Sequence, residues 1–590
     1  MPPTTSIPLR LSCIFPLGTS RPKRQAAASL MPVSLQNALS AGHLRTRKRI
    51  SNSFRLQNCR EWFRTGTPAA QHGRLIRRFN SAPDGELPNQ FCAYIDRGTK
   101  MSVNVDHPAL PSSIADGRTL YIAGRWSAAT DTYERVDPSD LRRVTGIYAS
   151  ATPRNVEAAY AAAGRAQPAW SETTAIQRSD FLRSAADLLE IRVHDAALTI
   201  TADMGKAIRD ARAEVLRSVA ILRYYAGEIL QPSGETYPSA DPHTMLMTVE
   251  EPLGVVCAIT PWNFPFALPA WKIAAAIGFG NAVVWKPAEP ACGSAVFLTR
   301  ILEEAGLPAG VLNLVTGSGR KLSAALTGNA RLAALTFTGS GAVGSRLRQA
   351  VADRNVKVQL ELGGKNPSIV LADADVEDAA QQIVKSAMLH TGQRCTATSR
   401  VYVDRAVAPR LRELLVKHAD ALVVGDPYDE ATDIGPLASV EQRDTVVGYL
   451  RLARDENAEF LTGREFDSDT CYIAPTVLAG VSEESRLVRD EIFGPVVTVQ
   501  EVDGFDGALK AANDTDYGLS SGVFTRDIAT AMTFIRRTQS GLVHVNRETS
   551  SVEPHVPFGG LKGSSSMSRE QGKAARTFFT TTKTAYVRWT

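Results

Sequence analysis

The feature that most constrains the fold is a regular alternation of short apolar runs and helical segments, which begins at Gly254. Each run has the length of a buried strand, and a loop and a helix-like stretch separate it from the next. Strands are expected at 255–259, 282–285, 311–315 and 334–337, with helices at 271–277 and 294–305. Alternating βαβ units predict a parallel, doubly wound sheet that binds ligands at the carboxyl ends of its strands.

A second region of this kind runs from about residue 367 to 543, with strands expected at 368–371 and 400–403. Ahead of both regions, residues 121–126 alternate like an opening hairpin, and residues 156–230 have the pattern of helices. We expect Ser179 to cap one of these helices. A stripe at helical spacing is expected to face the core, and its members are Val215, Val219, Leu222 and Ala226.

The chain length of 590 residues exceeds what one hydrophobic core can hold, so we expect at least two domains. Residues 1–100 are rich in Arg and Ser and carry 16 Lys or Arg against 4 Asp or Glu. The net charge of +5 for the whole chain therefore leaves −7 on the remaining 490 residues. Because the basic character belongs to the first hundred residues, no nucleic-acid partner is needed to explain it.

Two interpretations of residues 1–100 stay open. Translation that starts at Met101 would leave them outside the native protein, because a folded-domain composition begins after that residue. Alternatively, the Arg-rich and acid-poor composition is typical of an organellar transit peptide. We expect a disordered or non-native extension in both cases. The first interpretation implies a cytoplasmic protein and the second a mitochondrial one.

Cysteine spacing and hydropathy exclude two further classes. The seven cysteines form neither CxxC pairs nor a His/Cys cluster, so we expect no metal site and no disulfide framework. The longest apolar stretch, at about 273–285, is interrupted by Gly278, Gly280 and Asn281. It is too short to span a bilayer, so we expect no membrane partner.

A thiol and a carboxylate indicate covalent catalysis. Cys395 lies in the run GQRCTA, and Glu361, in the run ELGGKN, precedes it by 34 residues. A thiolate can attack an electrophilic carbon, and a carboxylate can then activate water to release the acyl group. A single cysteine is more often an inert buried thiol, so this hypothesis needs support from other parts of the chain.

Two further runs supply that support: PWNFP at 261–265 and KPAE at 286–289. In order and spacing, the four runs resemble the NAD(P)-dependent aldehyde dehydrogenase superfamily over about residues 110–588. The resemblance implies an α/β fold with a Rossmann-type cofactor domain, an α/β catalytic domain and a β-strand oligomerisation arm. The boundaries it implies are 101–233 and 252–362 for the NAD(P)-binding domain, 234–251 and 576–590 for the arm and tail, and 363–575 for the catalytic domain.

The resemblance also implies a role for each site residue. Cys395 is the nucleophile, Glu361 is the general base, and the side-chain amide of Asn263 stabilises the alkoxide together with the backbone N–H of Cys395. The implied cofactor contacts are Trp262, Lys286, Glu289, Gly339, Ser340, Leu362, Glu491 and Phe493. Residues 557–563 match the C-terminal signature of the superfamily. The serine-rich run after them departs from it, and Met567 stands where glycine is usual.

The loop from Gly339 to Gly344 satisfies the GxGxxG pattern between an expected strand and a helix. The usual rule would then make Glu361, 22 residues after Gly339, a ribose ligand. We follow the resemblance instead, because it places the ribose contacts on Lys286 and Glu289 and also gives roles to the other site residues. A carboxylate at Glu289 can accept bonds from both ribose hydroxyls and would repel a 2′-phosphate, so NAD is favoured over NADP.

Within the superfamily, the segments 390–400, 553–560 and 569–572 look most like 2-oxoglutarate semialdehyde dehydrogenases. This likeness implies a small-molecule semialdehyde substrate such as 2,5-dioxopentanoate. Succinate semialdehyde dehydrogenases typically carry an arginine six residues before the nucleophile, where this chain has Leu389. An acidic substrate needs a cation in its pocket. The candidates are Arg394, Arg400 and His555.

Three alternatives stay open: a succinate semialdehyde dehydrogenase, an aromatic or medium-chain aldehyde dehydrogenase with an apolar pocket, and a non-catalytic structural protein that keeps the fold. Proteins of the last class usually lack the nucleophile or the base, and this chain has both. Superfamily members form dimers or tetramers through the arm and tail, so we expect a homodimer or homotetramer. Residues 580–587 are β-prone and suit an added edge strand.

Overall fold

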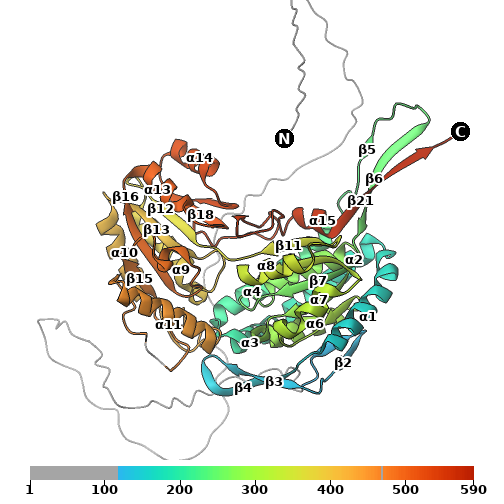
Figure 1. Cartoon of the computed structure of the whole chain (residues 1–590), viewed down its shortest axis with the longest axis horizontal. Helices are drawn as coiled ribbons and strands as arrows, with labels where there is room; N and C mark the ends of the chain where they lie inside the picture. Colours follow the sequence, from blue (N-terminus) through green and yellow to red (C-terminus); the bar gives the residue numbers. More distant parts are fainter. Residues whose placement is uncertain (1–116, 467–468) are drawn as a thin grey trace, which may run out of the picture. The chain divides into compact units, whose positions relative to one another are not determined.

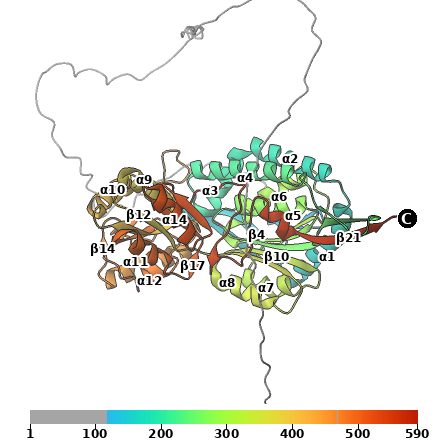
Figure 2. The same cartoon turned by 90° about the horizontal axis from the view of Figure 1, so that it is seen from above.

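The computed structural model describes residues 117–466 and 469–590, so the expectations for residues 1–100 lie outside the described part. Two seven-stranded sheets dominate it, and helices pack on both faces of each (Figures 1 and 2). This arrangement confirms the expected α/β class. Among the described residues, no helix is both long and apolar enough to cross a membrane.

The first sheet has the order β11 (Lys357–Glu361), β10 (Leu332–Thr338), β7 (Val255–Thr260), β8 (Ala282–Pro287), β9 (Leu312–Leu314), β1 (Leu120–Ile122) and β2 (Arg125–Ser127). The first five strands are parallel, and the β1–β2 hairpin adds to one edge in antiparallel fashion. Val256 packs with Trp285 in one core, whereas Val255 and Val284 pack in the core on the other side. Because both faces are buried, the strands have apolar residues at every position. The expected strands are confirmed.

Helices and one 3₁₀ turn connect and cover these strands: α1 (Pro153–Ser171), α2 (Ala175–Ile191), α3 (Val193–Met204), α4 (Ile208–Glu228), α5 (Ala267–Gly278), η1 (Glu289–Ala291), α6 (Cys292–Glu304), α7 (Gly319–Gly328) and α8 (Gly341–Ala350). The apolar stripe expected on α4 is buried. The prediction that Ser179 caps a helix is wrong. Thr174 caps α2 in a reciprocal pair of hydrogen bonds with Gln177, so the helix begins earlier. Ser179 is internal, and its hydroxyl donates to the Ala226 carbonyl at 2.7 Å.

The second sheet has the order β14 (Glu459–Phe460), β15 (Thr476–Ala479), β16 (Val496–Val502), β13 (Thr398–Asp404), β12 (Asn366–Val370), β18 (Ser520–Phe524) and β19 (Leu542–Val545). All of its strands are parallel except β14. Its helices and turn are α9 (Val376–Met388), η2 (Leu389–Gly392), α10 (Ala408–Asp420), α11 (Val440–Asp455), α12 (Arg486–Arg489), α13 (Gly504–Asn513) and α14 (Ile528–Arg537). Helices α9 and α10 share one core, and α13 and α14 share the core on the opposite face.

Three strands form an arm beside the first sheet (Figure 1). Strand β6 (Thr244–Pro252) pairs along its whole length with β21 (Thr580–Arg588), and β5 (Thr236–Tyr237) pairs on its other side. The strand expected at 580–587 is therefore confirmed. Helix α15 (Ala574–Phe579) precedes it and buries its phenylalanines in the first core. Two small antiparallel pairs complete the described part: the hairpin of β3 (Thr132–Asp137) with β4 (Asp140–Ala149), and β17 (Tyr517–Gly518) with the distant β20 (Leu561–Lys562).

Candidate active site

Cys395 lies in the loop between η2 and β13, and two side chains hold that loop. The side-chain amide of Asn366 donates to the carbonyl oxygens of Cys395 and Ala397, both at 2.8 Å. The hydroxyl of Thr549 donates to the carbonyl oxygen of Thr396, also at 2.8 Å. Since Asn366 and Thr549 are buried, the backbone on both sides of the thiol has a defined position.

The backbone just before this loop is strained. His390 and Thr391 are left-handed, with φ of 56° and 57°. This conformation costs a non-glycine residue roughly 1–2 kcal/mol. The Thr391 hydroxyl donates to the Gly435 carbonyl at 3.0 Å, which helps to hold the backbone in place. Strain of this kind concentrates at functional sites.

Glu361 is the last residue of β11, and its side chain is buried. Oε2 accepts a 2.6 Å hydrogen bond from the Ser565 hydroxyl. Oε1 has no hydrogen-bond partner within the described part of the chain. Burial raises the pKa of Glu361 well above its usual value, and the Glu570 carboxylate raises it further. A carboxyl group in such a place is suited to exchange protons near neutral pH.

Nearby carboxylates also affect the pKa of the Cys395 thiol. Burial raises its pKa to about 12, and the charges of Glu491 and Glu361 add to the increase. The fold has therefore brought the thiol and the Glu361 carboxylate, 34 residues apart, into one electrostatic environment. At that pKa the thiol is protonated at neutral pH unless another charge stabilises the thiolate.

A buried ion pair that the sequence analysis missed interacts with Glu361. Lys272 on α5 pairs with Glu570, which also accepts a hydrogen bond from the Trp271 indole at 2.6 Å. Lys272 donates to the Thr336 hydroxyl at 2.9 Å as well. The only signal in the sequence was a likeness over residues 569–572, which says nothing about a contact 298 residues away.

Asn263 lies in the loop between β7 and α5, next to the loop that carries Cys395. Its side-chain amide donates to the Gln393 carbonyl at 3.0 Å, two residues before the thiol. Its own carbonyl oxygen accepts a 2.8 Å bond from Lys206, which is paired with the buried Glu214. The structure thus brings together all three residues expected to carry catalysis.

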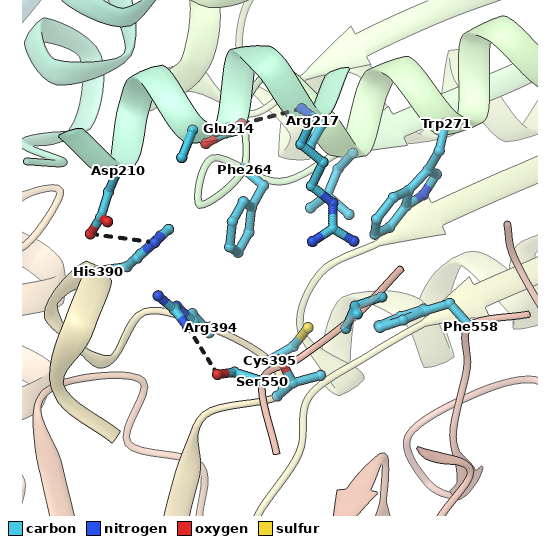
Figure 3. A pocket seen from close by; sticks show the side chains of 15 residues that line it. Asp210, Glu214, Arg217, Phe264, Trp271, His390, Arg394, Cys395, Ser550 and Phe558 are labelled. Atoms are coloured by element: carbon cyan, nitrogen blue, oxygen red, sulfur yellow. Dashed lines mark hydrogen bonds and ion pairs between the residues drawn. The ribbon is translucent and has the colours of Figure 1, made fainter. Parts of the chain in front are cut away.

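A cavity of about 220 Å³ opens beside Cys395 (Figure 3). Aromatic side chains form part of its wall, namely Phe264, Trp271 and Phe558. Two arginines also line it: Arg217 from α4 and Arg394 next to the thiol. In the part of the chain that the structure describes, the buried Nε atoms of both arginines have no hydrogen-bond partner. Buried donors are nearly always paired, so these two favour a ligand that accepts hydrogen bonds.

Of the three cationic residues proposed from the sequence to bind an acidic substrate, the structure places one at the cavity. Arg394 lines the cavity, and its Nη1 donates to the Ser550 hydroxyl at 2.9 Å. The expectation for Arg400 and His555 is wrong. Arg400 is a buried residue of β13 in the second sheet, where its Nε donates to the Lys365 carbonyl at 3.0 Å. His555 is exposed and does not line the cavity. Arg217 was missed, because an arginine within a helical pattern is typically a solvated surface residue.

The residues expected to hold the cofactor gather mostly at the carboxyl ends of strands in the first sheet. Trp262 follows β7, Lys286 lies in β8 near its end, Glu289 begins η1, Gly339 and Ser340 lie between β10 and α8, and Leu362 follows β11. A Cβ added at Gly341, the first residue of α8, would meet nothing within 4 Å. The start of α8 therefore has room for a pyrophosphate at its backbone N–H groups.

Two more of the expected cofactor residues come from the segment between α12 and β16. Glu491 accepts a 2.9 Å hydrogen bond from the backbone N–H of Gly364, and burial raises its pKa to about 7. The ring of Phe493 meets that of Trp262 edge to face, with centroids 5.5 Å apart. A separate hollow of about 480 Å³ is lined by Glu289, Ser318 and Lys321, among others. These residues fit a dinucleotide that extends from this hollow along the strand ends.

Residues 126–585 match the sequence profile of the aldehyde dehydrogenase family. The chain is 42% identical to an alpha-ketoglutaric semialdehyde dehydrogenase of Bacillus subtilis, over 79% of this chain and 97% of that protein. It is 36% identical to a 2,5-dioxopentanoate dehydrogenase of Saccharolobus solfataricus, over 79% of this chain and 99% of that protein.

Solved structures show the same likeness. An NAD-dependent aldehyde dehydrogenase from Sinorhizobium meliloti superposes with a TM-score of 0.78 at 34% identity, covering 80% of this chain and 95% of that one. A betaine aldehyde dehydrogenase from Staphylococcus aureus in complex with NAD⁺ gives a TM-score of 0.77 at 31% identity, covering 80% and 94%. The expected resemblance and fold are thereby confirmed.

Proposed function

The chain belongs to the aldehyde dehydrogenase family, and from this premise we propose that it oxidises 2,5-dioxopentanoate to 2-oxoglutarate with NAD. The family membership makes it an NAD(P)-dependent aldehyde dehydrogenase. The observation that carries the choice of substrate is the pair of arginines, Arg217 and Arg394, in the cavity beside Cys395. Their Nε donors, which have no hydrogen-bond partner among the residues that the structure describes, suit the carboxylate of an acidic aldehyde.

Cys395 is the nucleophile in this proposal. Its thiolate adds to the aldehyde carbon and forms a thiohemiacetal whose oxygen carries the developing negative charge. The side-chain amide of Asn263 and the backbone N–H of Cys395 donate to that oxygen. NAD, when bound, accepts the hydride that leaves the same carbon. The acyl group then remains on the Cys395 sulfur as a thioester.

Glu361 is the general base that releases the product. Oε1, which no hydrogen bond occupies within the described ranges, takes a proton from a water molecule as the water oxygen attacks the thioester carbonyl carbon. The tetrahedral adduct collapses with cleavage of the carbon–sulfur bond, and the carboxylic acid leaves. Burial favours the neutral form of the carboxyl group, which makes the ionised form a stronger base than an exposed glutamate.

The residues assigned to hold the cofactor are Trp262, Lys286, Glu289, Gly339, Ser340, Leu362, Glu491 and Phe493. Lys286 and Glu289 bind the adenosine ribose, and the start of α8 after Ser340 binds the pyrophosphate. Glu491 and Phe493 hold the nicotinamide ribose and ring. A carboxylate at Glu289 would repel a 2′-phosphate, which is why NAD is the proposed cofactor.

The proposed domain boundaries are those implied by the resemblance: 101–233 and 252–362 for cofactor binding, 363–575 for catalysis, and 234–251 with 576–590 for the arm. A homodimer or homotetramer forms through the arm, in the cytoplasm. Large exposed apolar side chains on β6, on β21 and just after β21 support this assembly, among them Met245, Tyr586 and Trp589.

A rival substrate class has one observation in its favour. Aromatic rings line the same cavity, which would also suit an aromatic or medium-chain aldehyde. The two arginines favour the acidic aldehyde, because their buried Nε donors have no hydrogen-bond partner among the described residues and a carboxylate would supply one.

Rates of NADH formation with 2,5-dioxopentanoate, succinate semialdehyde and benzaldehyde test the proposal. We expect 2,5-dioxopentanoate to have the highest kcat/KM. Arg217→Met should lower that value about tenfold or more, since a charge-assisted hydrogen bond contributes about 1.5–3 kcal/mol. Benzaldehyde oxidation should not fall.

Arg223→Met is the matched control, because this arginine lies on the same helix but pairs with Asp187 and Glu190 at the surface. It should leave both substrates unaffected. If benzaldehyde is the fastest substrate, or if Arg217→Met slows all aldehydes equally, the acidic substrate is refuted.

A further inference from the structure

The run Ser564–Ser568 follows the C-terminal signature and departs from it, and the proposed mechanism gives it no role. In the structure it lies antiparallel beside β11, the edge strand of the first sheet. The Leu362 N–H donates to the Ser564 carbonyl at 2.9 Å, and the Ser566 N–H donates to the Leu360 carbonyl at 3.1 Å. Ser565 is therefore placed directly opposite Glu361 in a β-bridge.

The Ser565 hydroxyl is the donor in its hydrogen bond with Glu361. Its oxygen accepts a 2.6 Å bond from the backbone N–H of Gly560, and it lies 2.6 Å from Glu361 Oε2. A serine hydroxyl has a single proton, and a backbone N–H can only donate. The hydroxyl proton is therefore directed at Oε2, which is the arrangement that favours an ionised carboxylate.

The other carboxylate oxygen is kept open. Oε1 of Glu361 has no hydrogen-bond partner among the residues that the structure describes. Gly559 lies beside it with φ of 150°, and a Cβ at that position would lie 2.9 Å from Oε1. The loop thus binds one oxygen of the carboxylate and leaves space next to the second.

We propose that Ser565 is a positioning residue that holds Oε2 of Glu361, so that Oε1 is presented to the water that hydrolyses the thioester. This inference rests on the proposed role of Glu361 as general base. In the step, Oε1 takes one proton from water, the water oxygen bonds to the thioester carbonyl carbon, and the carbon–sulfur bond breaks. The Ser565 proton stays on its own oxygen throughout.

Neighbouring charged groups and the hydrogen bond from Ser565 together shift the pKa of Glu361. Glu570, from the same C-terminal segment as Ser565, raises the pKa of Glu361, whereas Lys272 from α5 and Arg569 lower it. The Cys395 thiol also interacts with Glu361. The bond from Ser565 also lowers the pKa of Glu361. Without it the carboxyl group stays protonated to a higher pH, and the base is inactive over that range.

The test compares Ser565→Ala and Ser565→Gly with Ser565→Thr in the full-length enzyme with NAD and 2,5-dioxopentanoate. In the first two variants we expect kcat at pH 7 to fall about tenfold or more, because a hydrogen bond to a charged group contributes about 1.5–3 kcal/mol. The acid limb of the kcat–pH profile should move up by about one pH unit or more. A rapid burst of about one NADH per subunit should precede slow turnover. Ser565→Thr, which keeps the hydroxyl, should restore kcat and the pH profile.

Ser566→Ala is the matched control, because Ser566 bonds the Leu360 N–H in the same segment without touching the Glu361 carboxylate. It should retain the wild-type pH profile and show no added burst. Glu361→Gln separates the two proposals. If this variant turns over at the normal rate, the general base is assigned wrongly. If it gives a burst without turnover while Ser565→Ala and Ser565→Gly keep the wild-type kcat and acid limb, only the role of Ser565 is refuted.

Discussion

The Cys395 thiol should react slowly in the protein without cofactor, because the structure raises its pKa to about 12. Burial is the largest cause, and the carboxylates of Glu491 and Glu361 add to it. At pH 8 a thiol with this pKa is ionised in about one molecule in 10⁴, compared with about one in four for an ordinary cysteine. The more basic thiolate is about 25 to 50 times more nucleophilic, which offsets part of the difference. Alkylation should therefore be about 50 to 100 times slower than that of an unperturbed thiol.

The assay is the rate of iodoacetamide labelling of Cys395, followed by peptide mass spectrometry between pH 6 and pH 10. We expect the rate to rise with pH over the whole range without a plateau. Glu491→Gln should raise the rate above about pH 7, where the Glu491 carboxylate is ionised, because it removes a negative charge that opposes ionisation of the thiol. Addition of NAD should raise it as well, since the positive nicotinamide ring favours the thiolate. Cys395→Ala gives the background from the other cysteines.

A plateau below pH 9 in the absence of cofactor would refute this reasoning. It would mean that a donor or a positive charge already stabilises the thiolate. An unchanged rate in Glu491→Gln would show that this carboxylate does not influence the thiol.

Three further positions test the buried ion pair at Lys206, the left-handed backbone at Met567 and the choice of cofactor by Glu289. Lys206→Met should lower the free energy of unfolding by about 3–5 kcal/mol, measured by urea denaturation, because it leaves the fully buried Glu214 without its positively charged partner and with only the backbone N–H groups of Phe266 and Ala267 as donors. A loss below about 1 kcal/mol would contradict it. The same variant should reduce kcat with every aldehyde, as Lys206 also bonds the carbonyl of Asn263. Met567 is left-handed, with φ of 69°, and its side chain is 83% exposed. Met567→Gly should therefore raise the melting temperature and stabilise the protein by about 0.5–1 kcal/mol, whereas Met567→Val should destabilise it. Glu289→Gln should raise the ratio of kcat/KM with NADP to that with NAD about tenfold, and an unchanged ratio would show that this carboxylate does not select the cofactor.

Local patterns in the sequence were sufficient for much of the architecture. The apolar runs of the first sheet predict its parallel strands, because strands buried on both faces carry apolar residues at consecutive positions. The spacing of Val215, Val219 and Leu222 predicts the buried face of α4, because residues three and four positions apart lie on the same side of a helix. The cap of α2 was misplaced at Ser179, since serine, threonine and aspartate are interchangeable as caps and only the hydrogen bonds distinguish Thr174.

What the sequence by itself determined are the elements, the motifs and the family resemblance, all of which depend on residues close together in the chain. The tertiary structure alone decided which distant side chains meet. It placed Arg217 rather than Arg400 in the cavity beside Cys395, and it set Ser565 against Glu361, 204 residues earlier. Such contacts leave no periodic trace, because they arise where separately folded segments pack together and where burial, not spacing, sets the charge and reactivity of each group.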